Sequence, residues 1–202
     1  MTRELRAGER DGAPTRIAVA RREYPADAAE LWNALTDPER IPRWFLPVTG
    51  ELRPGGRYRF EGNASGTVLN CEAPHSFAIT WEMMGSPSWV TVTLTPVSHG
   101  TELELVHEAH VPEEFWSLYG PGAVGIGWDG ALMGLGLHLD SGASVDPQLA
   151  MTLPFTEEGR AFYRTAAEGW TDAAIAAGED PEAMRAAGEG AYAFYTTAPE
   201  GT

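Results

Sequence analysis

The chain has 202 residues, 43% of them hydrophobic, which is enough for one domain with a sizeable core. Its formal net charge of −15 argues against nucleic acid and anionic membranes as partners, because both require a basic surface. The single cysteine, Cys71, excludes an internal disulfide and suits a reducing cytoplasm. No apolar run approaches the roughly 20 residues of a membrane span. We therefore expect an acidic, cytoplasmic protein, for which a homodimer stays open.

The first part of the chain predicts a leader, a strand and two short helices. Residues 1–14 have no apolar core and predict a flexible leader. Apolar residues alternate over 16–23, as in a strand. Asp27 and Glu30 then form a capping-box pattern at the start of a helix. A second helix begins at Asp37, because proline at the first helical position needs no N–H partner.

Residues 49–110 alternate with a period of two between tight turns. In one segment Phe77, Ile79 and Trp81 alternate with smaller or polar residues. In the last segment, Glu102 and Glu104 alternate with apolar residues and should lie on the solvated face. This pattern predicts a curved antiparallel sheet of about six to seven strands, with one apolar face.

A long helix is predicted over 121–139, and it is apolar on two sides. One stripe contains Trp128, Leu132, Leu135 and Leu139, at the spacing i, i+4, i+7 and i+11. A second stripe contains Ile126, Met133 and Leu137. We expect the sheet to cover the first stripe. The glycines between 120 and 134 indicate either a mobile helix start or close approach of a neighbouring chain segment.

Two more helices are predicted in the tail, over 156–177 and 181–195. Their apolar positions include Phe162, Tyr163, Trp170, Phe194 and Tyr195. We expect them to pack on the second stripe of the long helix. The chain is thus divided into a leader (1–14), a main domain (15–142) and a C-terminal helical extension (155–197) packed on the central helix.

Five segments carry a resemblance to a known superfamily, in the expected order. They are YPADAAELWNALTDPERIPRWF (24–45), LRPGGRYRFEG (52–62), GTVLNCEAPHSFAITWE (66–82), VTVTLTPVSHGTELELVHE (90–108) and GWDGALMGL (127–135). The chain resembles the START-like, or SRPBCC, helix-grip superfamily, in the branch related to the activator of heat-shock-protein-90 ATPase. The resemblance implies an α+β helix-grip fold, with the sheet wrapped around the long helix and a deep apolar cavity between them. Because members differ widely in activity, it implies no particular reaction.

The predicted ligand-binding residues combine inward-facing sheet positions with the long helix and the segment before it. They are Trp81, Met83, Leu105, His107, Trp116, Tyr119, Trp128, Leu132 and Leu135. His107 is interpreted either as a hydrogen-bonded core histidine or as a polar anchor or acid/base in the cavity. His107 and His110 do not have the spacing of a metalloprotease helix, so we expect no metal and no other cofactor.

Three functions follow from this interpretation. The first is a cytoplasmic protein that binds a small hydrophobic molecule in the cavity. The second is an enzyme of the cyclase or hydrolase type, with His107 or Tyr119 as acid/base. The third is a chaperone-associated or other protein-interaction module, which an exposed apolar patch on the sheet would favour.

Overall fold

The structure is a computed structural model that describes residues 1–83 and 85–197. Within these residues, eight antiparallel strands form one curved sheet in the order β1-β2-β8-β7-β6-β5-β4-β3. The strands are Thr2–Arg10 (β1), Ala13–Tyr24 (β2), Val48–Gly50 (β3), Arg57–Phe60 (β4), Ser65–Glu72 (β5), Ser76–Met83 (β6), Ser86–Val97 (β7) and Gly100–Ala109 (β8). The predicted α+β helix-grip fold is confirmed, with β1 and the short β3 as the outermost strands.

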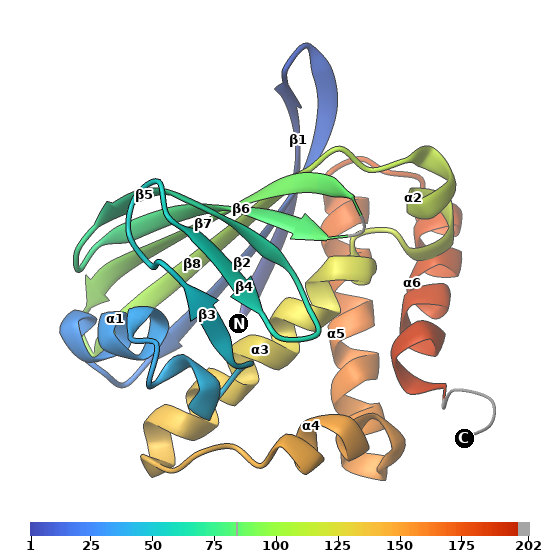
Figure 1. Cartoon of the computed structure of the whole chain (residues 1–202). Helices are drawn as coiled ribbons and strands as arrows, with labels where there is room; N and C mark the ends of the chain where they lie inside the picture. The colour runs from blue at the N-terminus through green and yellow to red at the C-terminus, as the bar shows by residue number, and fades with distance from the viewer. Residues whose placement is uncertain (84, 198–202) are drawn as a thin grey trace.

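The helices lie on one side of this sheet and beyond its end (Figure 1). They are Ala28–Thr36 (α1), Glu113–Tyr119 (α2), Gly122–Ser141 (α3), Pro147–Thr152 (α4), Glu157–Ala176 (α5) and Pro181–Thr196 (α6). Short 3₁₀ turns occur at Ile41–Arg43 (η1) and Leu153–Phe155 (η2). The long helix α3 crosses the face of the sheet, while α5 and α6 stand beside it. None of the described helices is long and apolar enough to cross a membrane.

The N-terminal residues are an edge strand, so the prediction of a flexible leader over 1–14 is wrong. β1 pairs with β2 along its whole length, from Thr2 opposite Arg21 to Arg10 opposite Ala13. Asp11 and Gly12 join the strands with φ angles of 53° and 75°, the backbone that a tight Asp-Gly hairpin requires. The strand is stable with few apolar residues, because its backbone pairs with β2 and its charged side chains form further bonds.

Both tail helices lie against α3, but the contact differs from the one predicted. Ile126 is fully buried there, whereas Leu137 is 44% exposed and does not lie under the tail. Gly125 faces Trp170 of α5 so closely that a Cβ would lie 2.3 Å from the indole ring. The glycine therefore serves close approach of a neighbour. Phe194, expected to pack inward, is 64% exposed. The exact division between domain and extension stays a prediction.

A buried polar group takes the place of the expected apolar contact on the tail side of α3. The Asp129 side chain is fully buried and accepts hydrogen bonds from Arg3 Nε at 2.8 Å and from Trp170 Nε1 at 3.2 Å. Burial raises the pKa of Asp129 to about 6, against the opposing effect of Arg3. This carboxylate therefore joins β1 and α5 to the central helix.

Candidate functional site

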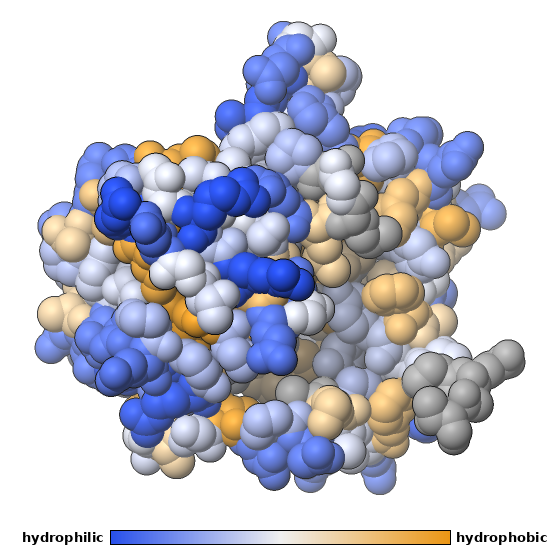
Figure 2. Space-filling view, viewed as in Figure 1, coloured by the Kyte–Doolittle hydropathy of each residue, from blue (hydrophilic) through white to orange (hydrophobic). Residues whose placement is uncertain are grey.

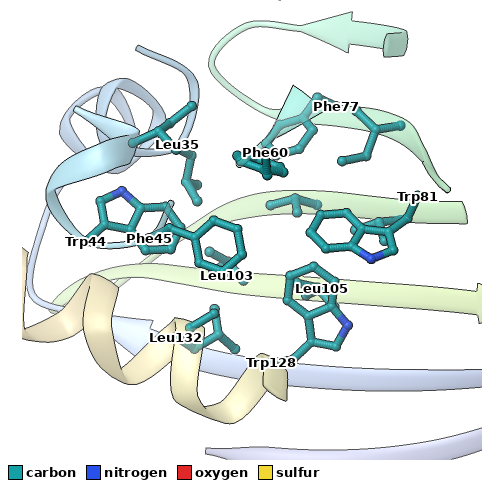
Figure 3. Close-up of a pocket in the computed structure, with 15 residues that line it drawn as sticks. Leu35, Trp44, Phe45, Phe60, Phe77, Trp81, Leu103, Leu105, Trp128 and Leu132 are labelled. Carbon is teal, nitrogen blue, oxygen red and sulfur yellow. The ribbon is translucent and has the colours of Figure 1, made fainter. Parts of the chain in front are cut away.

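An apolar cavity of about 90 Å³ lies between the sheet and α3. Every side chain that lines it is apolar, and six of them are aromatic. The lining residues are Leu35, Ile41, Trp44, Phe45, Phe60, Phe77, Ile79, Trp81, Val90, Val92, Leu103, Leu105, Trp128, Ala131 and Leu132. Figure 3 shows the rings of Trp44 and Phe45 on one side of this space, opposite those of Trp81 and Trp128.

The sheet wall of the cavity follows from the alternation of side chains along each strand. Phe77, Ile79 and Trp81 are every second residue of β6, so all three point to the same face. Leu103 and Leu105 do the same on β8 and are almost fully buried. The period-two pattern in the sequence thus builds a continuous apolar surface that faces α3.

The opposite wall comes from the segment that follows α1. Trp44 and Phe45 come directly after η1, and both are half-buried. The Trp44 Nε1–H donates to the carbonyl oxygen of Ala34 at 2.9 Å, so its polar edge is turned toward α1. The Phe45 ring meets Phe60 edge to face, with 5.1 Å between ring centroids. This wall lies outside the strands of the sheet.

His107 lies behind Trp128 and connects it to the sheet. The Trp128 Nε1–H donates to His107 Nδ1 at 2.9 Å, and His107 Nε2 lies 2.8 Å from Ser88 Oγ. The Ser88 hydroxyl donates in turn to the carbonyl oxygen of Trp81 at 2.9 Å. Because an indole N–H can only donate, Nδ1 must be unprotonated, and the neutral ring carries its proton on Nε2.

This arrangement makes His107 unsuited to acid/base work in the cavity. The side chain is buried, and burial lowers its pKa to about 4. Both ring nitrogens already have partners within the protein. Of the two earlier interpretations, the geometry therefore favours a hydrogen-bonded core histidine over an acid/base that touches a ligand.

Four of the predicted ligand-binding residues lie together in the cavity wall. They are Trp81, Leu105, Trp128 and Leu132. The Trp81 and Trp128 rings lie 4.9 Å apart between centroids. Leu135 is fully buried in the same core but is not part of the lining, and His107 lies one layer behind Trp128.

Three predicted residues lie elsewhere. Met83 is 47% exposed at the end of β6, where the strand has passed the end of the cavity. Trp116 belongs to a second apolar cluster with Leu5 and Met184, beneath the tail. Tyr119 contacts Phe194 of α6, with 5.5 Å between ring centroids. The prediction placed the helix before α3 at the cavity, whereas the structure turns α2 toward α6.

The sequence prediction also missed lining residues that a pattern could have identified. Phe77 and Ile79 share the alternation of Trp81, and Phe60 belongs to an alternating pair on β4. Their inward direction could therefore have been inferred. Trp44 and Phe45 follow a turn, and no periodicity gives the direction of residues there.

His107 and His110 do not form a joint site. His110 Nδ1 lies 3.0 Å from the carbonyl oxygen of Pro14, and its ring meets Trp89 edge to face. His107 instead points to the helix side of the sheet, toward Trp128. Within the described residues, no group of three or more His, Cys, Asp or Glu side chains is arranged to hold a metal ion.

Solved structures resemble this chain over most of its length. CalU16 from Micromonospora echinospora is 31% identical; its crystal structure has a TM-score of 0.68 and covers 86% of this chain and 97% of CalU16. Its solution structure has a TM-score of 0.73, with 87% and 95% covered. Protein MLL2253 from Mesorhizobium loti is 27% identical, with a TM-score of 0.56, and covers 62% of this chain and 97% of its own.

The family comparison agrees with these structures. No curated protein matches the chain at a significant level. A family model described as "Activator of Hsp90 ATPase homolog 1-like protein" matches residues 25–139. This range runs from the start of the helical segment after β2 to the last turn of α3, and it includes every residue that lines the cavity. The chain therefore belongs to the family of activator of Hsp90 ATPase homologue 1-like proteins.

Proposed function

We propose that this protein binds a small, flat, aromatic molecule in the cavity between the sheet and α3. The observation that carries the proposal is a cavity lined by apolar side chains alone, six of them aromatic. Small-molecule sites in proteins are mainly apolar concave surfaces of this kind. Aromatic walls favour an aromatic ligand, because rings pack edge to face or offset with a gain beyond the area that they bury.

The size of the cavity limits what it holds without rearrangement. A volume of about 90 Å³ is small compared with the roughly 300–1,000 Å³ of sites for drug-sized ligands. A ligand of two rings therefore has to displace one wall. Trp44 and Phe45 are half-buried, as Trp81 on the sheet is, but they follow a 3₁₀ turn and lie outside the strands, so no sheet hydrogen bonds hold their backbone. The displacement thus costs least on the side of η1, where we place the entrance.

The enzymatic and chaperone-associated alternatives have weaker support. An acid/base role needs a titratable group that reaches the ligand, but His107 is occupied on both nitrogens and Tyr119 lies against α6. On the described part of the sheet, the large apolar side chains that are exposed are Leu69 and Met83, on two different strands. Figure 2 shows apolar atoms over α2 and α6 and also over the strands, where polar side chains separate them into small patches.

A titration with naphthalene tests the proposal. Tryptophan emission should change with naphthalene concentration and reach a plateau, because Trp81 and Trp128 line the cavity. Ala131→Leu fills the cavity from α3 and should weaken binding at least about tenfold, since the ligand and the new side chain compete for one space. Val124→Leu is the matched control, because Val124 is exposed on the same helix and outside the cavity. Equal binding by the wild type and Ala131→Leu would refute the proposed site.

A further inference from the structure

We propose that His107 is a specificity-determining positioning residue of the cavity, an inference that rests on the proposed binding function. By accepting the indole N–H of Trp128, it holds that polar group out of the cavity. The Trp128 side of the cavity then favours aromatic molecules that place no hydrogen-bond acceptor against it. His107 itself does not touch the ligand in this role, because it lies behind Trp128.

The direction of the hydrogen bonds between Trp128, His107, Ser88 and Trp81 is forced. The indole can only donate, and the carbonyl oxygen of Trp81 can only accept. The Ser88 hydroxyl gives its proton to that carbonyl, so toward His107 it can only accept. The imidazole must therefore accept at Nδ1 and donate at Nε2, and no other neutral arrangement satisfies all three bonds. Ser88 and His107 are both buried, so water does not compete for these bonds.

This forced direction fixes which edge of the Trp128 ring faces the cavity. The Trp128 and His107 rings meet nearly at right angles, at 82°, with 5.8 Å between centroids. Figure 3 shows the indole nitrogen on the side of Trp128 turned away from Phe45 and Leu132. The Trp44 N–H is likewise bound to a backbone carbonyl. Two of the three indoles in the lining thus present ring carbons to the cavity.

The ligand chemistry follows from this orientation. An acceptor atom that enters the cavity loses its hydrogen bonds to water and finds the Trp128 N–H already engaged. A ring of the same shape with a C–H group at that position has no hydrogen bonds to water to lose. A site that leaves a polar ligand atom unpaired discriminates against it. His107 should therefore control the preference between two ligands that differ only in one acceptor.

Naphthalene and quinoline are such a pair, because quinoline replaces one C–H group with an acceptor nitrogen. Dissociation constants for both are measured by calorimetry at pH 8, where quinoline is neutral. The wild type should prefer naphthalene. In His107→Phe the freed Trp128 N–H can turn to the quinoline nitrogen, so the preference should fall by about threefold to tenfold, the value of one hydrogen bond. His107→Gln can both accept and donate, and should restore the wild-type preference.

The controls separate this inference from the proposed function. His99→Phe changes an exposed histidine in the β7–β8 turn and should leave the preference unchanged. If His107→Phe does not fold, His107→Leu supplies the test: it also removes the acceptor for the Trp128 N–H, and the preference should fall in the same direction. Binding of both compounds with an unchanged preference overturns the role of His107 alone. If the wild type binds neither compound, the proposed function fails, and this inference fails with it.

Discussion

Two buried groups, His107 on β8 and Asp129 on α3, should respond to acid with opposite effects on the stability of the fold. Burial lowers the pKa of His107 from 6.5 to about 4, because the charged imidazolium would lose its hydration. Burial raises the pKa of Asp129 from 3.8 to about 6 for the same reason, although Arg3 opposes this shift. Each group thus favours its neutral form in the folded state.

The signs follow from which state binds the proton more tightly. The unfolded chain binds a proton at His107 more tightly than the folded state does, so stability is lost as pH falls below 6.5. Between pH 7 and 5 this loss amounts to about 2 kcal/mol. For Asp129 the folded state binds the proton more tightly, so stability is gained as pH falls through 6 toward 3.8. That gain is about 1 kcal/mol over the same range, and the two contributions largely cancel.

A substitution that removes one of the two titrating groups should reveal the effect of the other group on the pH dependence of stability. His107→Gln removes the titration and keeps an acceptor for Trp128, so this variant should become more stable from pH 7 to pH 5, relative to wild type, by about 2 kcal/mol. Asp129→Asn keeps an acceptor for Trp170 and should become less stable over that range, by about 1 kcal/mol relative to wild type. Urea denaturation at both pH values measures these free energies of unfolding.

Each comparison has an internal reference. Asp129→Asn loses its ion pair with Arg3 and will be destabilised at both pH values, so only the change between them bears on the prediction. His99→Gln replaces an exposed histidine and should follow the wild type. The reasoning is refuted if His107→Gln and Asp129→Asn have the same pH dependence as the wild type.

Two further predictions concern stability at neutral pH. Gly125→Ala should destabilise the protein by about 1–3 kcal/mol, because the new Cβ would lie 2.3 Å from Trp170. Gly130→Ala places its Cβ in open space and should stabilise the helix by up to about 1 kcal/mol. Thermal denaturation would show the opposite shifts, and two shifts of the same sign would contradict the close contact. Replacing both Glu102 and Glu104 with Gln should cost no more than about 1 kcal/mol, since their side chains lie on the outer face and surface ion pairs contribute little. A much larger loss in urea denaturation would contradict that placement.

The strands could be predicted wherever one face of the sheet is buried. Leu103 and Leu105 alternate with glutamates, and that alternation places them under α3 as the structure has them. β1 has no such pattern, since Leu5 is its one large apolar residue in the core. Backbone pairing and ion pairs hold this strand, and single-sequence periodicity does not detect either of them. The Asp11-Gly12 hairpin was the available signal.

The candidate site could be predicted only in part, for a related reason. Trp81 and Trp128 were identified because each belongs to a periodic stripe on its own strand or helix. Trp116 has a comparable apolar setting in the sequence but belongs to the cluster beneath the tail. Its place depends on the direction that the chain takes after β8. Asp129 was missed because a polar residue in an apolar helix gives no indication of which distant partner, here Arg3, will reach it.

Two adjacent residues of α3 attach the helix to different neighbouring elements. These attachments limit the route by which a ligand could enter the cavity. The Trp128 side chain is bound to His107 of β8, and Asp129 is bound to Arg3 of β1 and to Trp170 of α5. Because these bonds point in different directions from adjacent positions, they oppose both rotation of the helix and its separation from the sheet. The segment with Trp44, on the other side of the cavity, follows a short 3₁₀ turn and lies outside the strands of the sheet. A ligand larger than the present cavity should therefore move this segment and leave α3 in place.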